Sequence, residues 1–255
     1  MDKITIVKIG GKIINEEELL RDFLWQFAKI HGLKILVHGG GRSASQMLSS
    51  LGIEARMHNG RRITDSATLD VCVGQYAGRI NKKIVSLLQT IDVDALGLSG
   101  ADGGIIKAKK RPDEPFDYGF AGDIVRVKSN RILGLLKLGF VPVFCAITAD
   151  QNGQLLNTNA DTIAASLAVS LIGKAEVDLR FCFEFDGVLE DLESDRIIKT
   201  IKSQEFESLV DQSILNGGIL PKVQNAIAAK KNGVGNVAIC GSSNLVDLIN
   251  ATQIV

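Results

Sequence analysis

Two glycine-rich turns in the sequence have the residue types that bind an anion. The first is VKIGGK, residues 7–12, where Lys8 precedes Gly10 and Gly11 at the end of an apolar run. The second is LVHGGGRSAS, residues 36–45, where three glycines follow an apolar run and a helix-like segment begins. Backbone N–H groups at such turns and at the beginning of a helix bind phosphate or carboxylate oxygens. Both turns therefore predict anion sites.

Lys8 is a charged residue on an otherwise apolar strand face, which it shares with Ile4 and Ile6. A charge at the carboxyl end of a buried strand must face a cleft or a partner. In open parallel sheets, ligand clefts form at those ends. The alternative is a strand-end lysine that reaches water beside an ordinary turn.

The spacing Gly39-x-Gly41-x-x-Ala44 would also satisfy a loose dinucleotide fingerprint. That reading requires an acidic residue at the end of a second strand about 20 positions further on. The sequence instead has the polar loop GIEARMHNGRRITD, residues 52–65. This loop disfavours dinucleotide binding. The guanidinium of Arg62 would suit a bidentate grip on a carboxylate, although an arginine in a polar loop is usually solvated.

The segment LLNTNADTIAASLAVSLIG, residues 155–173, places Asn157, Asn159 and Asp161 before or at the beginning of an apolar helix. The ordinary interpretation makes Asp161 the N-cap and the asparagines turn residues. Alternatively, three amide or acid groups within five residues would form a compact polar cluster in a cleft.

Lys222 follows Pro221 in NGGILPKVQNAIAAKKNG, residues 216–233, near the first turn of a predicted helix. A cation in that turn opposes the helix dipole, and a bound polyanion would reverse the sign of the effect. A flexible lysine could also turn away. Because the chain has no G-x-x-x-x-G-K-[ST] loop, any nucleotide must be held by another architecture.

Short apolar runs alternate with amphipathic stretches along the chain. This alternation predicts parallel strands covered by helices on both faces, a single three-layer α/β/α domain. Asn15 and Glu18 have the spacing of a capping box for a helix that ends near Gly32, and a long helix is expected over residues 66–88. Residues 103–128 predict a β-hairpin. The expected strands are ITIVKI, KILVH, ALGLS, VPVFCAI, VDLRFCF and NVAIC.

The composition excludes several classes of function. Lys and Arg total 29 and Asp and Glu total 29, so no excess charge suggests binding to nucleic acid or to an anionic membrane. The four cysteines form no C-x-x-C pair and the three histidines have no metal-ligand spacing, so we expect reduced thiols and no protein-bound metal. The sequence also lacks a secretory signal and an apolar stretch of about 20 residues. We therefore expect a soluble cytoplasmic protein.

In their order and spacing, the motifs VKIGGK, LVHGGGRS, NGRRIT, NTNAD and GGILPK resemble the amino-acid kinase family. Within that family, NGRRIT and NTNAD resemble the motifs of the branch that acts on N-acetyl-L-glutamate. The resemblance implies an α/β/α sandwich around a mainly parallel sheet of about eight strands. It implies an N-terminal lobe, about residues 1–173, for the acyl-amino acid and a C-terminal lobe, about residues 174–255, for ATP. It also implies a homodimer.

The resemblance further implies phosphorylation of the γ-carboxylate of N-acetyl-L-glutamate by ATP, in arginine biosynthesis, with Mg²⁺ carried by the nucleotide. Lys8 and Lys222 would stabilise the transferring phosphoryl group, Gly11 would donate a backbone hydrogen bond to it, and Asp161 would orient the lysines. The acyl-glutamate would bind at Gly40, Gly41, Arg62, Asn157 and Asn159. The nucleotide would bind at Gly10, Glu184, Gly187, Gly217 and Gly218.

One departure from the family concerns the nucleotide. The family usually has a Ser/Thr-Asp pair where this sequence has Phe183 and Glu184, and phenylalanine cannot donate a hydroxyl hydrogen bond. Three alternatives stay open: an N-succinyl or other N-acyl-glutamate as substrate, a kinase for carbamate, aspartate or another small acid, and a non-catalytic amino-acid-binding or regulatory protein.

Overall fold

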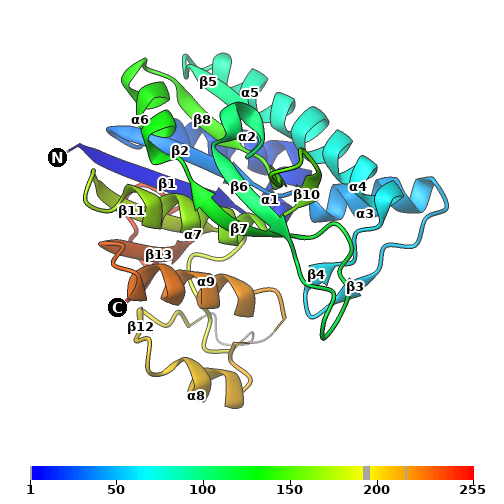
Figure 1. The fold of residues 1–255 in the computed structure, drawn as a ribbon. Helices are drawn as coiled ribbons and strands as arrows, with labels where there is room; N and C mark the ends of the chain where they lie inside the picture. The colour runs from blue at the N-terminus through cyan, green and yellow to red at the C-terminus, as the bar shows by residue number, and fades with distance from the viewer. Residues whose placement is uncertain (1, 192–195, 216) are drawn as a thin grey trace. The chain divides into compact units, whose positions relative to one another are not determined.

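The computed structural model describes residues 2–191, 196–215 and 217–255. The chain divides into two compact units, unit 1 with Met1–Lys34 and Ala164–Val255 and unit 2 with Ile35–Ile163 (Figure 1). Lys8 and Lys222 therefore belong to the same unit. The lobe boundary implied by the resemblance, near residue 173, would have placed them in different lobes. The division into an acyl-amino-acid lobe and an ATP lobe remains a prediction.

Unit 1 has a largely parallel set of five strands in the order β12-β14-β13-β11-β1. Strands β1, β11 and β13 run parallel, whereas β14 runs antiparallel to β13 and β12 pairs parallel with β14. From Ile4 to Ile9 every residue of β1 is buried, as expected for a strand covered on both faces. The strands are β1 (Lys3–Ile9), β11 (Glu176–Cys182), β12 (Thr200–Ile201), β13 (Asn236–Cys240) and β14 (Thr252–Ile254).

The capping box predicted at Asn15 is wrong. A short helix, α1 (Gly11–Asn15), ends at that residue, and α2 (Glu17–Ala28) begins after Glu16, whose side chain makes no capping hydrogen bond. The helix predicted to follow is confirmed as α2, and Leu20 and Phe23 are among the residues it buries. The other helices of unit 1 are α8 (Phe206–Asp211) and α9 (Leu220–Lys231), and α7 (Ala160–Leu171) spans the boundary between the units.

Unit 2 contributes the parallel strands β2 (Leu33–His38), β8 (Val141–Phe144) and β5 (Ala95–Leu98). With the five strands of unit 1 they make the eight expected. The predicted hairpin is confirmed, because β6 (Ile106–Lys110) and β7 (Gly122–Val127) pair antiparallel. A smaller sheet joins them to β9 (Ile147–Ala149) and β10 (Leu155–Asn157), and β3 (Met57–His58) pairs with β4 (Arg61–Arg62).

The prediction of one strand for VPVFCAI is wrong. The chain leaves the parallel sheet after β8 and enters the smaller sheet as β9, with Cys145 between the two strands. The backbone on both sides of this transition stays hydrogen-bonded to residues 98–100: Cys145 N–H donates to Leu98 O at 2.9 Å, and Ile147 O accepts from Gly100 N–H at 2.7 Å. The new sheet neighbours of β9 are β10 and β6.

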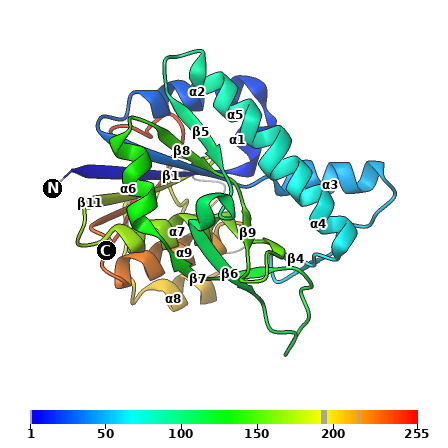
Figure 2. The same ribbon diagram turned by 45° about the horizontal axis from the view of Figure 1, so that its top comes forward.

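The helix predicted over residues 66–88 is confirmed, with an irregularity that the sequence did not predict. It comprises α4 (Ser66–Val73), a π-helical segment (Gly74–Ile80) and α5 (Asn81–Gln89). Helix α5 lies along β5 (Figure 2). The remaining helices of unit 2 are α3 (Gly41–Ser50), a 3₁₀ turn (Asp102–Gly104) and α6 (Ser129–Lys137).

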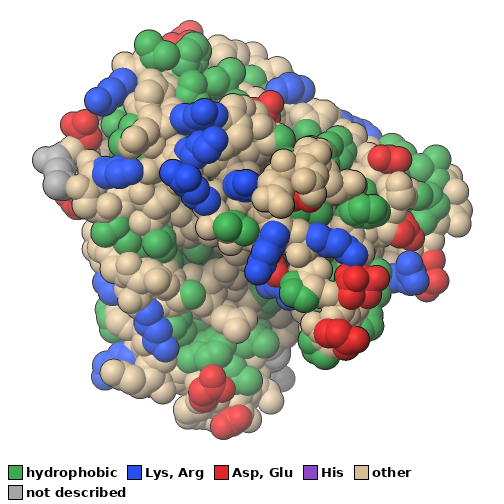
Figure 3. Space-filling model, viewed as in Figure 1, with side chains coloured by type: hydrophobic (Ala, Val, Ile, Leu, Met, Phe, Trp, Pro, Cys, Tyr) green, Lys and Arg blue, Asp and Glu red, His purple; other side chains and the backbone are tan. Residues whose placement is uncertain are grey.

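Strand β6 exposes one face to solvent. Lys107 and Lys109 are exposed, whereas the alternating residues Ile106 and Ala108 are buried. Lys and Arg side chains gather over β6 and α6 in Figure 3.

None of the helices formed by residues 2–191, 196–215 and 217–255 has the length and apolarity needed to cross a membrane.

Candidate active site

The turn Gly39–Gly41 connects β2 to α3 in unit 2. A Cβ atom on Gly40 would lie 2.5 Å from Cδ1 of Tyr76 and 2.6 Å from Cδ1 of Ile80. Both contacts are far too short for carbon atoms, so only glycine lets the π-helical segment approach the turn. Gly41 begins α3, where the first N–H groups of a helix have no partner inside it. The two predicted substrate glycines thus form a closely packed turn at a helix N-terminus.

Arg62 is held against this turn. Its Nη2 donates to Gly41 O at 2.9 Å and to Ser45 Oγ at 2.7 Å, and the residue is only 8% exposed. Its Nη1 is buried and has no hydrogen-bond partner within the part of the chain that the structure describes. A buried guanidinium nitrogen without an acceptor is costly, and a bound carboxylate would supply one. The solvated-loop interpretation of Arg62 is therefore wrong.

Asn157 lies near the same place. Its Nδ2 donates to Thr64 Oγ1 at 3.0 Å, and Thr64 in turn donates to Arg62 O at 3.0 Å. The Gly39 Cα faces the beginning of α7, since a Cβ built there would lie 3.7 Å from Cβ of Ala160. The structure thus brings Gly40, Gly41, Arg62 and Asn157 into one region of unit 2.

Asn159, rather than Asp161, is the cap of α7. Thr162 N–H donates to Asn159 Oδ1 at 2.9 Å, so Asp161 occupies the first helical turn. This corrects the ordinary interpretation of Asp161 as the N-cap. The residue is nevertheless buried, with 6% exposure, in the first turn of α7.

In unit 1, Lys8 lies near the carboxyl end of β1 beside Phe181 of β11 and is 7% exposed. The amide of Gly10 is already used, because it donates to Cys182 O at 2.8 Å. The prediction that the Gly10 N–H is available to a phosphate is therefore wrong. Gly11 differs from Gly10 in its surroundings. No atom lies within 4 Å of a Cβ built on Gly11, so this residue borders open space.

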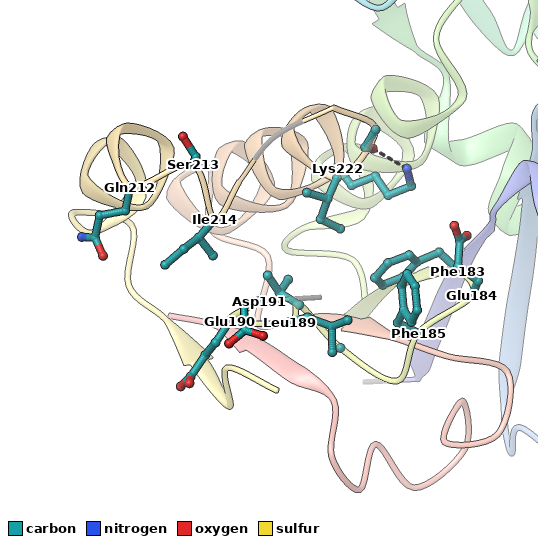
Figure 4. A pocket seen from close by; sticks show the side chains of 14 residues that line it. Phe183, Glu184, Phe185, Leu189, Glu190, Asp191, Gln212, Ser213, Ile214 and Lys222 are labelled. Atoms are coloured by element: carbon teal, nitrogen blue, oxygen red, sulfur yellow. Dashed lines mark hydrogen bonds between the residues drawn. The ribbon is translucent and has the colours of Figure 1, made fainter. Parts of the chain in front are cut away.

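A cavity of about 590 Å³ lies in unit 1, beside the loop that follows the carboxyl end of β11. Its size is typical of a small-molecule site. Glu184, Gly187, Gly218 and Lys222 of the predicted set line it, from the loop after β11 and from the beginning of α9 (Figure 4). Lys222 lies in the first turn of α9, as predicted, and its Nζ donates to Gly218 O at 2.6 Å.

The phenylalanines after β11 form an aromatic wall of this cavity. Phe183 and Phe185 meet edge to face with their ring centroids 5.9 Å apart, and Phe185 is 40% exposed (Figure 4). Phe183 N–H donates to Cys240 O at 3.0 Å. An exposed aromatic surface of this kind is suited to stacking against a planar ligand.

Two of the predicted nucleotide glycines have different structural reasons for being glycine. A Cβ on Gly187 would lie 2.5 Å from Cγ2 of Ile197 and 2.8 Å from Thr252 Oγ1, so close packing demands it. Gly217 has a φ of +48°, the left-handed region that favours glycine. Both lie on loops of unit 1: Gly187 itself lines the cavity, and Gly217 precedes Gly218, which also lines it.

Sequence reasoning missed several residues of these two regions. Ser45 and Thr64 hold Arg62 and Asn157, but serine and threonine carry no signal by themselves. Ser45 lies one helical turn after Gly41, which brings it to the same side of α3. The missed lining of the cavity is part apolar and part polar: Phe185, Val188, Leu189, Ile214 and Ile219 on the apolar side, and Glu190, Asp191, Gln212 and Ser213 on the polar side.

Unit 2 thus holds an arginine, amides and a helix N-terminus suited to a small carboxylate ligand. Unit 1 holds two lysines and a part-apolar cavity suited to a phosphorylated ligand with a planar group. Residues 2–191, 196–215 and 217–255 contain no group of three or more His, Cys, Asp or Glu side chains that could hold a metal ion.

Curated relatives match almost the whole chain. The sequence is 48% identical to an acetylglutamate kinase of Parabacteroides distasonis over 96% of each chain. It is 46% identical to one of Cytophaga hutchinsonii over 100% of this chain and 97% of the relative. A protein of the same name in Methanopyrus kandleri is 35% identical over 96% of this chain and 97% of the relative.

Solved structures share the fold at low sequence identity. N-acetylglutamate synthase of Neisseria gonorrhoeae has a TM-score of 0.81 at 21% identity, covering 99% of this chain and 59% of that one. Giardia carbamate kinase has a TM-score of 0.70 at 14% identity, covering 100% and 98%. These similarities confirm the predicted fold class. The family model described as "Amino acid kinase family" matches residues 3–241, and the chain therefore belongs to the amino acid kinase family.

Proposed function

We propose that this protein is an acetylglutamate kinase, which transfers the γ-phosphoryl group of ATP to the γ-carboxylate of N-acetyl-L-glutamate in arginine biosynthesis. The observation that carries the proposal is the 46–48% identity, over 96–100% of this chain, to relatives with that name. The two sites described above fit the two substrates, a small dicarboxylate and a nucleotide.

The acyl-glutamate would bind in unit 2. A substrate carboxylate that accepts from Nη1 of Arg62 would give this buried nitrogen the partner it lacks among the described residues. The amides of the Gly40–Gly41 turn and the side chains of Asn157 and Asn159 would supply further hydrogen bonds. Arg62 would discriminate against ligands without that carboxylate, because such ligands would leave its charge buried and unsatisfied.

The reaction needs no general base. The γ-carboxylate, with a pKa of about 4.3, is ionised at neutral pH. One of its oxygens attacks the γ-phosphorus, an O–P bond forms, and the bond from that phosphorus to the bridging oxygen of the β-phosphate breaks. The products are the acyl phosphate and ADP. The difficulty is the approach of one anion to another, so catalysis must come from positioning and from fixed positive charge.

Lys8 and Lys222 would provide that charge, and Gly11 would donate a backbone hydrogen bond to the phosphoryl group. Asp161, buried at the beginning of α7, would orient the lysines. The nucleotide would occupy the cavity of unit 1, with its base against Phe183 and Phe185 and its phosphates toward Lys222. Mg²⁺ would enter with ATP, held mainly by phosphate oxygens.

The most direct test of the activity is a hydroxamate assay. The protein is incubated with ATP, Mg²⁺, hydroxylamine and N-acetyl-L-glutamate, and the acyl phosphate is trapped as a coloured hydroxamate. N-succinyl-L-glutamate, aspartate and carbamate are supplied in parallel. Hydroxamate from N-acetyl-L-glutamate supports the proposal. Product from N-succinyl-L-glutamate alone would change the acyl group, and no product from any acid would favour the non-catalytic alternative.

Replacement of either lysine tests the catalytic assignment. We expect Lys8→Ala and Lys222→Ala each to lower kcat about 100-fold or more, with a modest change in KM, because the lost charge acts in the transition state. Lys231→Ala, at the far end of the same helix α9, is the matched control and should keep wild-type kinetics. Near-normal turnover of either test variant would refute the assignment.

The resemblance also leads us to propose a homodimer in the cytoplasm. Multi-angle light scattering of the purified protein checks the oligomeric state. Twice the 27.4 kDa chain mass is expected, and a monomer or a hexamer would contradict it.

A further inference from the structure

His38 is a buried histidine whose surroundings the proposed chemistry does not use. It ends β2, directly before the Gly39–Gly41 turn, and is 0% exposed. Its Nδ1 lies 2.8 Å from Gly39 O and its Nε2 lies 3.0 Å from Asn81 Nδ2. Both ring nitrogens are therefore engaged, one by the turn itself and one by the first residue of α5.

The partners decide which nitrogen carries the proton. A carbonyl oxygen only accepts, so Nδ1 must donate to Gly39 O, and Nε2 must then accept from Asn81. The orientation of the Asn81 amide is set independently. Its Nδ2 also donates to Val143 O at 2.9 Å, and its Oδ1 accepts from Lys82 Nζ at 3.3 Å.

Space for the Asn81 amide depends on Gly97 in β5. A Cβ on Gly97 would lie 2.0 Å from Asn81 Oδ1, so no other residue could stand there without moving the amide. An ordered chain of contacts therefore leads from Gly97 through Asn81 and His38 to the Gly39 carbonyl.

The turn is thus held at three points. His38 holds the carbonyl of Gly39, Tyr76 and Ile80 pack against Gly40, and Arg62 holds the carbonyl of Gly41. A peptide carbonyl and the following N–H point in opposite directions, so fixing the Gly39 carbonyl also fixes the direction of the Gly40 N–H. That N–H belongs to the turn assigned to the acyl-glutamate.

We propose that His38, set in its Nδ1–H tautomer by Asn81, is a positioning residue that aims the Gly40 amide at the carboxylate substrate. The inference rests on the proposed function and adds to it the residues that organise the substrate turn. His38 does not touch the substrate and transfers no proton. A change at His38 should therefore affect the binding of N-acetyl-L-glutamate and leave the binding of ATP unchanged.

Two isosteric variants test the proposal. Asparagine places its amide nitrogen where Nδ1 of histidine lies, whereas glutamine places it where Nε2 lies. We expect His38→Asn to bind N-acetyl-L-glutamate within about threefold of wild type, and His38→Gln to bind it about tenfold more weakly, the equivalent of one buried hydrogen bond. Isothermal titration calorimetry gives Kd and steady-state kinetics give both KM values. His31→Gln, at an exposed histidine, is the control.

A double-mutant cycle tests the role of Asn81. Asn81→Ala should weaken substrate binding, and His38→Gln combined with Asn81→Ala should weaken it by less than the two single effects together, because both act through one contact. Circular dichroism confirms that each variant is folded.

Equal Kd values for His38→Asn and His38→Gln would overturn the proposal, as would a parallel rise in the KM for ATP, which indicates general damage to the structure. Independent effects of His38 and Asn81 would also overturn it. A wild-type protein that neither binds nor phosphorylates N-acetyl-L-glutamate would instead contradict the proposed function, and this inference with it.

Discussion

Arg62 shows how a residue of the candidate site is distinguished from an ordinary surface arginine. Its Nη2 is fully used by Gly41 and Ser45, while its Nη1 is buried with no acceptor in the described ranges. The sequence could suggest Arg62 only through its motif, because a polar loop normally leaves arginine in solvent. Its burial depends on Thr64 and Asn157, which join the loop to β10.

Substitution of Arg62 should therefore affect one substrate. We expect Arg62→Ala to raise the KM for N-acetyl-L-glutamate about 10- to 100-fold, the value of a hydrogen-bonded charge, and to leave the KM for ATP nearly unchanged. Arg62→Lys should recover little, since an ammonium cannot reproduce the planar fork. Steady-state kinetics with each substrate varied in turn provide the measurement. An equal rise in both KM values would argue against a carboxylate role.

His38 gives the protein a specific dependence of stability on pH. Burial lowers the pKa of His38 to about 4, against a smaller raising effect of its hydrogen bond to Gly39, and Lys82 is the charged group nearest in its network. In the unfolded chain its pKa is about 6.5. Between these values the unfolded chain binds a proton that the folded chain excludes, so stability is complete above pH 6.5 and falls as the pH decreases toward 4.

The size of this effect can be measured. The shift corresponds to about 3 kcal/mol of unfolding free energy at most. Urea unfolding at pH 7.5 and pH 5 should show a smaller loss of stability in His38→Asn than in the wild type. An identical loss in both proteins would mean that His38 is not the group responsible.

At the scale of elements, the glycine turn depends on the segment Gly74–Ile80. This segment is π-helical, and its Tyr76 and Ile80 side chains occupy the space that a Cβ on Gly40 would need. The sequence predicts a helix over residues 66–88 but gives no signal for a wider turn inside it. π-Helical turns are rare, and those that occur inside helices are frequently at functional sites.

Two glycine-to-alanine substitutions should have opposite effects. Gly40→Ala would force Tyr76 or Ile80 to move and should lower the unfolding free energy by about 1–3 kcal/mol. Gly134→Ala, in an exposed part of α6 with no atom within 4 Å of the new Cβ, should raise it by about 0.5–1 kcal/mol. Thermal unfolding followed by circular dichroism compares them. Stability changes of the same sign would contradict the packing described here.

Element types were predictable where periodicity was strong, and boundaries were less so. The parallel strands and the hairpin of β6 and β7 follow from apolar runs and alternation. The two strands within VPVFCAI are not visible as such, because both are apolar and the change of sheet at Cys145 depends on tertiary pairing. Asn15 has a favourable local spacing, yet it ends α1, since α2 begins two residues later.

At the scale of the whole molecule, the two proposed catalytic lysines come from distant parts of the chain and fold into one unit. Lys8 lies in β1 and Lys222 in α9, and the unit that holds them also holds the cavity proposed for the nucleotide. The sequence pointed to both lysines through the unfavourable positions of their charges. It could not show that Gly10 gives its amide to Cys182, because that hydrogen bond joins residues far apart in the sequence.

The central claim is that a carboxylate oxygen of the substrate attacks the γ-phosphorus of ATP. N-acetyl-L-glutamate labelled with ¹⁸O in its γ-carboxylate is phosphorylated in the presence of hydroxylamine, which attacks the acyl carbon and releases phosphate. Because the bridging oxygen leaves with the phosphorus, the released phosphate should carry one ¹⁸O, detected by ³¹P NMR. Phosphate without the label would show that water, rather than the carboxylate, accepts the phosphoryl group.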